Sequence, residues 1–291
     1  MRAKIIFILS LLFAPCLIQW NINGLKTRMN NGELQRLIKD QDPAVICLQH
    51  INEPIDKLGK YHNVTITQPN PNEMGTCILV HEKVSHEVLQ ITTDELQVTG
   101  IKLILSQTLQ ILIYNLYNQP KCNYNLNNIK NLFNANPCNT LILGDFNAHS
   151  MLWNSTCTKV DRNGKIVENL IDELDLCILN DPESETYFSH THNTFSAIDL
   201  SLCTLDIVEK CEWSIKEDYY TSDHAPIIID FLTPEPIKLN PKYKTDKADW
   251  PKYKMLTNAM PPINFNQPID DINDNFVKFI KDAANKSIPI S

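Results

Sequence analysis

Short apolar runs separated by turns extend from about residue 17 to residue 232 and predict a series of β-strands. Each run is rich in Ile, Leu, Val or Thr and is bounded by polar residues, as the strands of packed sheets are. The predicted strands cover residues 16–21, 45–48, 77–80, 98–105, 109–116, 140–143, 198–202 and 227–231.

Helical periodicity occurs at two places between these strands. Apolar residues three and four apart follow Asn163–Gly164, and a shorter amphipathic segment around Leu34, Leu37 and Ile38 precedes the strand at 45–48. Consecutive strands with helices between some of them predict an α/β fold in which sheets pack face to face and helices lie outside.

The pattern changes at both ends of the chain. Residues 233–291 hold 8 of the 17 prolines and few apolar runs before 276–284, which predicts a Pro-rich tail with one helix and not a second domain. Residues 1–16 form an apolar extension similar to a secretory signal, but Pro15 disrupts the cleavage candidate at Ala14 and the run is too short to span a bilayer. We therefore expect an intracellular protein, nuclear or cytoplasmic, without stable membrane association; secretion is the less favoured alternative.

Glycine and cysteine usage excludes several classes of protein. No two of the seven glycines lie within five residues of each other, so both the G-x-G-x-x-G fingerprint and the Walker A loop are absent. The nine cysteines are odd in number and form no C-x-x-C, which favours reduced thiols over a zinc ribbon or a disulfide framework.

The excess of acidic over basic residues lies in the second half of the chain. Of the net charge of −8, residues 1–150 carry +1 and residues 151–291 carry −9. Proteins that bind nucleic acid by charge alone are usually basic, so this class is disfavoured. An enzyme that holds a divalent cation among carboxylates stays open, because the ion supplies local positive charge.

Four segments at strand ends carry polar residues suited to metal or phosphate chemistry. Two of them pair such residues at a spacing of two: Asn21 with Asn23, and Asp145 with Asn147. This spacing places both side chains of a pair on one side of a strand. Taken alone, however, each of these two segments is also typical of a turn.

The other two segments add a carboxylate and a histidine. Asp199 lies inside an apolar strand, where a carboxylate costs free energy unless it is paired or bound to a metal, although a single hydrogen-bonded core carboxylate is an alternative. His224 follows Asp223, and a histidine side chain ordinarily titrates near neutral pH. The oxygen-rich set suits Mg²⁺ better than zinc, and its convergence on one pocket would fit hydrolysis of a phosphodiester.

These motifs, in this order, resemble the endonuclease/exonuclease/phosphatase superfamily, which includes DNase I and the abasic-site endonucleases. Within it the pattern is most similar to the endonuclease domain of jockey-like non-LTR retrotransposons. The segment Gly-Asp-Phe-Asn-Ala-His at 144–149, with Trp153 after it, is the most specific match. The resemblance covers residues 17–232. The tail is similar to the connector that precedes a reverse transcriptase in such elements, and the expected polymerase is not part of this sequence. The other matching segments are 17–25, 114–120, 162–164, 180–181, 196–200 and 222–226.

The resemblance implies a four-layer α/β sandwich of the DNase I type and a domain that nicks target DNA with Mg²⁺ or Mn²⁺. It further implies DNA as the substrate, no small-molecule cofactor and a monomer. Asp145 would activate or orient the attacking water, Asp199 would orient His224, and His224 would stabilise charge on the phosphate or act as base. Tyr117 and Asn147 would contact the phosphate. The implied metal and phosphate site would comprise Asn21, Asn23, His50 and Asp223.

One position departs from the family pattern. After the second core strand the family has Gln-Glu, whose glutamate is the main metal ligand, whereas this chain has Gln49-His50, with Glu53 three residues later. Imidazole is a poor Mg²⁺ ligand and prefers softer ions. Two alternatives to an active endonuclease therefore stay open: a catalytically inactive remnant of the domain, and a phosphatase or phospholipase of the same fold.

Overall fold

The computed structural model describes residues 15–67, 74–91, 97–106, 109–120, 125–134, 139–232, 244–261 and 268–289. The chain divides into two compact units, residues 1–238 and 239–291. The predicted extension at 1–16 lies outside the described residues except for its last two, and the predicted start of the tail at residue 233 opens a segment, 233–243, that also lies outside them.

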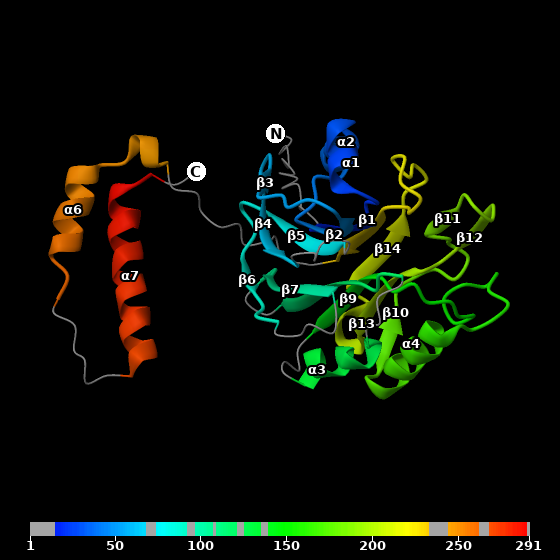
Figure 1. The fold of residues 1–291 in the computed structure, drawn as a ribbon. Helices are drawn as coiled ribbons and strands as arrows, with labels where there is room; N and C mark the ends of the chain where they lie inside the picture. Colours follow the sequence, from blue (N-terminus) through cyan, green and yellow to red (C-terminus); the bar gives the residue numbers. More distant parts are fainter. Residues whose placement is uncertain are drawn as a thin grey trace, which may run out of the picture. The chain divides into compact units, whose positions relative to one another are not determined.

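Two β-sheets lie face to face in the first unit, with helices on both outer sides (Figure 1). The first sheet has the order β14-β15-β1-β2-β5-β4-β3, and the second has the order β10-β13-β9-β8-β7-β6. A separate hairpin joins β11 and β12. The strands are β1 (Cys16–Asn21), β2 (Val45–Ile51), β3 (Lys57–Leu58), β4 (Tyr61–Ile66), β5 (Gly75–His81), β6 (His86–Val88), β7 (Gln97–Ile104), β8 (Gln110–Tyr117), β9 (Thr140–Asp145), β10 (Leu176–Ile178), β11 (Tyr187–Ser189), β12 (Thr194–Ser196), β13 (Asp199–Thr204), β14 (Cys211–Ile215) and β15 (Ile227–Phe231).

Helices cover the outer face of each sheet. The first sheet is covered by α1 (Leu25–Asn30) and α2 (Glu33–Gln41), and the second by α3 (Ile129–Asn134) and α4 (Arg162–Glu173) (Figure 1). Leu37 of α2 packs with Ile18 of β1, and Leu170 of α4 packs with Ile142 of β9. The remaining short helices are η1 (Leu126–Asn128) and α5 (Leu205–Val208). The predicted four-layer α/β sandwich is confirmed.

The central strands are apolar on both faces because each face is buried. In β1, Leu17 belongs to the core between the sheets, whereas Ile18 belongs to the core under the helices. Strands buried on both sides have continuous apolar runs, and such runs are the pattern from which the sequence analysis predicts these strands. The strands β3, β4, β6, β10 and β14, which lie toward the ends of the sheets, are only partly buried and were not predicted.

Gly144 allows β8 and β9 to pair next to the strand end that carries Asp145. Its φ is 147°, and a Cβ atom added there would lie 1.8 Å from the carbonyl oxygen of Leu116. Since that oxygen belongs to the backbone of the paired strand, it cannot move aside. We expect Gly144→Ala to lower the free energy of unfolding by about 4 kcal/mol or more, measured by urea denaturation.

Gly59 is the matched control for this substitution. It also has a positive φ, 59°, but a Cβ atom there would meet nothing within 4 Å. Gly59→Ala therefore reports the backbone strain alone, about 1–2 kcal/mol. Equal losses for the two variants would contradict the steric argument at Gly144.

The second unit contains two helices, α6 (Trp250–Asn258) and α7 (Ile269–Ser287), preceded by η2 (Thr245–Lys247). The backbone amide of Asp249 donates to Ser287 O at 2.8 Å, so the start of α6 lies beside the end of α7. The predicted helix at 276–284 lies inside α7, whereas α6 was not predicted. Asp249 caps α6 through the amide of Lys252, and Pro251 occupies its first turn, so the proline that indicated a linker begins a helix here. Among the helices of the described ranges, none combines the length and apolar character needed to cross a membrane.

Candidate active site

The side chains between the two sheets change from apolar to polar toward one edge of the sandwich. Along β1 the inward positions are Leu17, Gln19 and Asn21, and along β9 the apolar Leu143 is followed by Asp145. Inward positions are two residues apart, so the change from an apolar to a polar side chain occurs between one inward position and the next. The site forms where these strands reach the polar edge.

A buried polar layer lies one step below this edge and consists of Gln19, Gln49, Asn115 and Ser201. Gln19 Nε2 donates to Gly144 O and Leu200 O across the sheets at 3.2 Å each, and Ser201 Oγ donates to Gln19 Oε1 at 2.7 Å. Gln49 Nε2 donates to Asn115 Oδ1 at 2.6 Å. Buried hydrogen bonds are directional, so this layer fixes how the two sheets are aligned.

Asp145 is the last residue of β9 and lies between Tyr117 of β8 and Asp199 of β13 in the sheet. Its carboxylate is 2% exposed and accepts hydrogen bonds from Asn21 Nδ2 at 2.8 Å and from the Asn147 amide at 2.9 Å. Burial, together with the negative charge of Asp199, raises the pKa of Asp145 to about 7. A carboxyl group that titrates near neutral pH is suited to accept a proton in catalysis.

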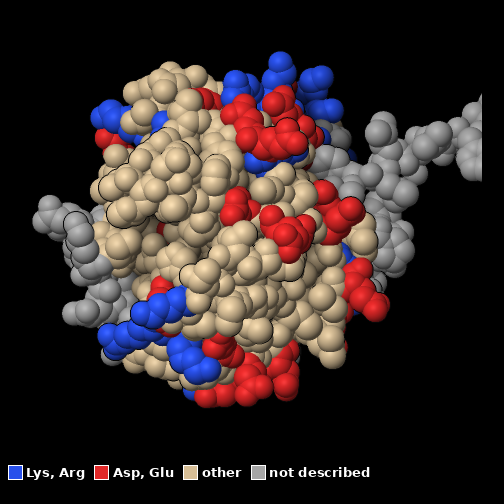
Figure 2. Space-filling view, turned by 90° about the vertical axis from the view of Figure 1, so that its right-hand side faces the viewer, with Lys and Arg blue, Asp and Glu red and all other residues tan. Residues whose placement is uncertain are grey.

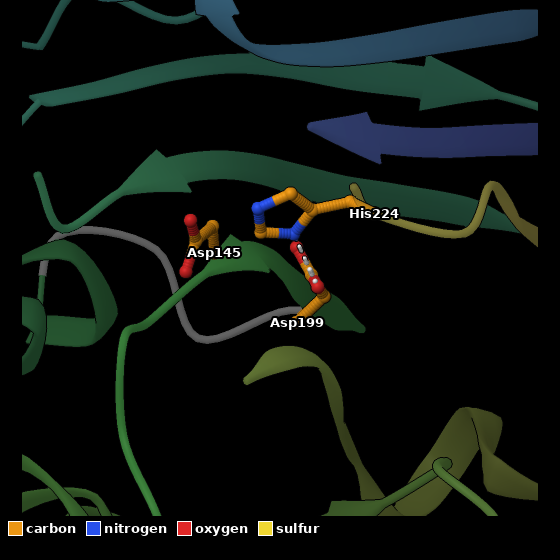
Figure 3. Close-up of side chains that lie close together, drawn as sticks. All are labelled: Asp145, Asp199 and His224. Atoms are coloured by element: carbon orange, nitrogen blue, oxygen red, sulfur yellow. Dashed lines mark hydrogen bonds and ion pairs between the residues drawn. The ribbon is translucent and has the colours of Figure 1, made fainter. Parts of the chain in front are cut away.

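His224 pairs with Asp199 beside this carboxylate. Its Nδ1 lies 2.8 Å from Asp199 Oδ2, and in Figure 3 the other ring nitrogen faces the side on which Asp145 lies. Burial alone lowers the pKa of His224, but the charges of Asp199, Asp145 and Asp223 outweigh it and raise the value to about 9. The ring is therefore an imidazolium at neutral pH, with Nε2–H directed away from Asp199.

Thr186 completes the support of Asp199. Its Oγ1 donates to Asp199 Oδ2 at 2.7 Å and accepts from the Asp199 amide at 3.1 Å. Tyr187, the next residue, lies against the His224 ring at 4.7 Å between centroids. Neither residue was predicted, because the segment between β10 and β13, which includes the hairpin of β11 and β12, carries no sequence pattern that marks them.

The asparagines Asn23 and Asn147 are held in the site by different hydrogen bonds. Asn23 Nδ2 donates to Asp223 Oδ1 at 2.8 Å, and that oxygen lies 3.9 Å from His224 Nε2. The backbone amide of Asn23 donates to Asn21 Oδ1 at 3.1 Å. The Asn147 side chain instead donates to Asn118 O at 3.0 Å, so that Asn118, which was not predicted as a site residue, orients it.

His50 and Tyr117 form a separate pair at the rim. The Tyr117 hydroxyl lies 3.3 Å from His50 Nδ1, and the rings are stacked at 5.5 Å. His50 has φ 58° at a bulge in β2, and its pKa is lowered by burial and by the charge of His224. Glu53, the alternative carboxylate, forms an exposed ion pair with Lys26 at 2.8 Å. The His50 position therefore offers a neutral nitrogen where the family pattern has a carboxylate.

The predicted site residues are thus brought together as two neighbouring sets, and their catalytic and metal-binding roles stay predictions. Hydrogen bonds and an ion pair connect the members of the larger set, which includes Asp145. Ring stacking connects His50 with Tyr117 in the smaller set, and the strand pairing of Tyr117 with Asp145 places the two sets side by side. The larger set is Asn21, Asn23, Asp145, Asn147, Asp199, Asp223 and His224, and the smaller is His50 and Tyr117.

The donor set fits a divalent cation. Asp145, Asp199 and His224 each offer one atom within 4.8 Å of the others. Asp199 Oδ1 is buried and has no hydrogen-bond partner among the described residues. The one imidazolium of His224 faces the carboxylates of Asp145, Asp199 and Asp223, so a bound cation would supply the positive charge that His224 alone does not.

The surface around this edge carries little positive charge of its own. Figure 2 shows the side of the molecule that is on the right in Figure 1, where the hairpin β11–β12 lies. Acidic side chains gather in the upper middle, in the centre, on the right and along the lower edge, whereas basic side chains lie at the upper edge and the lower left. The acidic side chains in the middle of this face would repel a polyanion unless cations were bound.

Comparison with known proteins agrees with this geometry. Residues 111–228 match the protein family described as "Endonuclease-reverse transcriptase". The endonuclease domain of TRAS1, a telomere-specific non-LTR retrotransposon, has a TM-score of 0.61 and 21% identity, with 75% of this chain and 98% of that chain covered. The AP endonuclease LMAP from Leishmania major has a TM-score of 0.58 and 12% identity, with 76% and 88% covered. The 3′ phosphatase NExo from Neisseria, bound to product DNA hairpin, has a TM-score of 0.52 and 17% identity, with 75% and 99% covered.

The architecture places the chain among proteins with the DNase I-like fold, which these solved structures share. Within that class, the matched family and the TRAS1 domain confirm the resemblance to the endonucleases of non-LTR retrotransposons. The jockey-like subtype stays a prediction.

Proposed function

We propose that this chain is the endonuclease domain of a retrotransposon-derived protein and that it nicks DNA by hydrolysing a phosphodiester bond with a divalent cation, Mg²⁺ or Mn²⁺. The observation that carries the proposal is the buried cluster of Asp145, Asp199 and His224 at the polar edge of the sandwich. Action on DNA as a monomer, in the nucleus or the cytoplasm, is part of the same proposal.

The residues of the cluster divide the chemistry between them. Asp145, with its pKa raised to about 7, would accept the proton of the attacking water or orient it. His224 would donate Nε2–H to the phosphate while Asp199 holds the ring through Nδ1. The Tyr117 hydroxyl and the Asn147 amide would contact phosphate oxygens. A bound cation, held by the Asp223 carboxylate with the side chains of Asn21, Asn23 and His50, would supply positive charge for the phosphate oxygens.

A plasmid assay tests this proposal. We expect the purified chain to convert supercoiled plasmid to nicked circles in Mn²⁺, more slowly in Mg²⁺, and not in EDTA. Asp145→Asn keeps the shape of the side chain and should abolish nicking. Release of phosphate from a 3′-phosphorylated oligonucleotide or from a phosphoinositide, without nicking, would instead identify a phosphatase.

An inactive remnant is the second candidate, and the neutral His50 at the rim is the observation that favours it. In that case the folded chain would give no turnover of plasmid or phosphate ester with either cation. The proposed endonuclease would then be wrong, although the fold would be unaffected.

A further inference from the structure

The turn that leads into Asp223 and His224 has an unfavourable backbone. Tyr220 and Thr221 both lie in the left-handed region, with φ 49° and 58°. Two such residues in succession are uncommon, and a β-branched residue in this region is an outlier. Such a conformation persists only where its surroundings hold it in place.

Arg28 and Glu33 hold this turn from outside the site. Arg28, which is 9% exposed, donates from Nη1 to Thr221 Oγ1 at 2.8 Å. The same hydroxyl donates to Glu33 Oε1 at 2.6 Å, and Arg28 Nη1 lies 3.7 Å from Glu33 Oε2. The Thr221 side chain is thus fixed by a buried arginine and a carboxylate, which accounts for the strained turn.

Arg28 also contacts the other segment of the site. Its Nε donates to Ile22 O at 3.3 Å, and Ile22 lies between Asn21 and Asn23. One guanidinium group therefore touches both the segment that carries the asparagines and the segment that carries Asp223.

Hydrogen bonds between the two segments depend on their spacing. Asn23 Nδ2 donates to Asp223 Oδ1 at 2.8 Å, and Ser222 Oγ donates to Asn21 O at 3.0 Å. The indole of Trp20 donates to His224 O at 3.0 Å. A shift of the Tyr220–Thr221 turn would change each of these distances.

We propose that Arg28, acting through the hydroxyl of Thr221, is a positioning residue that sets the spacing between the Asn21–Asn23 segment and the Asp223–His224 segment. Among the described residues its hydrogen bonds and ion pair join it to Ile22, Thr221 and Glu33, and not to Asp145 or the His224 ring. This inference rests on the proposed function for its kinetic part and on the structure alone for its spectroscopic part.

The test uses two substitutions at Thr221 that differ in the hydroxyl. Thr221→Val keeps the shape and the β-branch but loses the hydroxyl, whereas Thr221→Ser keeps the hydroxyl. We expect Thr221→Val to lower kcat for nicking by roughly 10–100-fold with little change in KM, because small displacements of catalytic groups cost that much. Thr221→Ser should stay within a few-fold of the parent.

A double substitution and a spectrum separate positioning from general stability. Arg28→Met should lower kcat at least as much as Thr221→Val does, because it also loses the hydrogen bond to Ile22 O. Adding Thr221→Val to Arg28→Met should lower kcat no further, because both changes break the connection between Arg28 and Thr221. In metal-free protein, the NMR signals of the His224 ring and of the Asn23 side-chain amide should shift in Thr221→Val and stay in place in Thr221→Ser. If Thr221→Val does not fold, Arg28→Lys, which keeps the charge but loses the planar fork, gives the same readouts.

Parental kcat or unshifted signals in a folded Thr221→Val variant would overturn the proposal. If the parent itself does not nick DNA, the proposed function fails, but the NMR comparison still decides whether Arg28 and Thr221 position the two segments.

Discussion

Replacing His224 by alanine is expected to lower the rate of plasmid nicking by ~10²–10⁴-fold without unfolding the protein, as is usual when a proton-transfer or charge-stabilising group is lost. The ring is the donor that faces the reacting phosphate in the proposed reaction, and Asp199 holds it at 2.8 Å. The measurement is the single-turnover nicking rate, with circular dichroism to establish that the variant is folded. Full activity would remove His224 from the mechanism.

The pH profile gives a second readout of the same substitution. Nicking should rise as Asp145 loses its proton, near its pKa of about 7, and fall as His224 loses its proton, near its pKa of about 9. His224 lowers the pKa of Asp145 by its positive charge. In His224→Asn the residual activity should therefore rise at a higher pH than in the parent and lose its alkaline decline. A bound cation would move the Asp145 limb to lower pH, because it favours the carboxylate.

Replacing His50 by glutamate is expected to raise Mg²⁺-dependent nicking by roughly 10–100-fold, the range by which ligand-shell changes alter metal affinity. A carboxylate would add a hard, charged oxygen that Mg²⁺ prefers, and the neutral imidazole cannot match it. The parent should nick weakly in Mg²⁺ and better in Mn²⁺, which accepts nitrogen more readily. Nicking across Mg²⁺ concentration, together with calorimetric Mg²⁺ binding, measures both effects.

Glu53→Gln is the control for the alternative ligand. Because the Glu53 carboxylate pairs with Lys26 at 2.8 Å and is half exposed, its loss should change little. A large loss in Glu53→Gln, with no gain in His50→Glu, would show that Glu53 moves into the site on metal binding. Strong Mg²⁺-dependent nicking that is insensitive to both substitutions would mean that neither residue is a ligand.

The sequence predicts the central part of the fold because burial on both faces leaves a readable pattern. Runs such as 45–48 and 140–143 lie between two apolar layers and contain few polar residues. The strand β14 escaped prediction because its five residues alternate between half-buried and exposed, as suits the end of a sheet. The α6 helix escaped prediction because Pro251 and its polar residues resemble a linker.

The site residues likewise divide into those that the sequence indicates and those that it does not. Asp145 and Asp199 follow from the sequence because they interrupt or end apolar strands, which a carboxylate does only at a cost. Thr186, Asn118 and Arg28 lie in segments without such a contrast, and their roles depend on contacts across the fold. Sequence patterns therefore identified the groups proposed to react, together with Asp199, and missed the other groups that orient them.

The buried polar layer below the site has a consequence for how such a protein can change. Displacing one sheet by a residue would break the hydrogen bonds that the amides of Gln19, Gln49 and Asn115 make across the sheets, at about 1–3 kcal/mol for each buried group left unpaired. Relative displacement of the sheets is thus opposed, and the residues proposed to cleave DNA keep one fixed alignment between the sheets. Loops beyond that edge can then vary in length and composition without moving these residues.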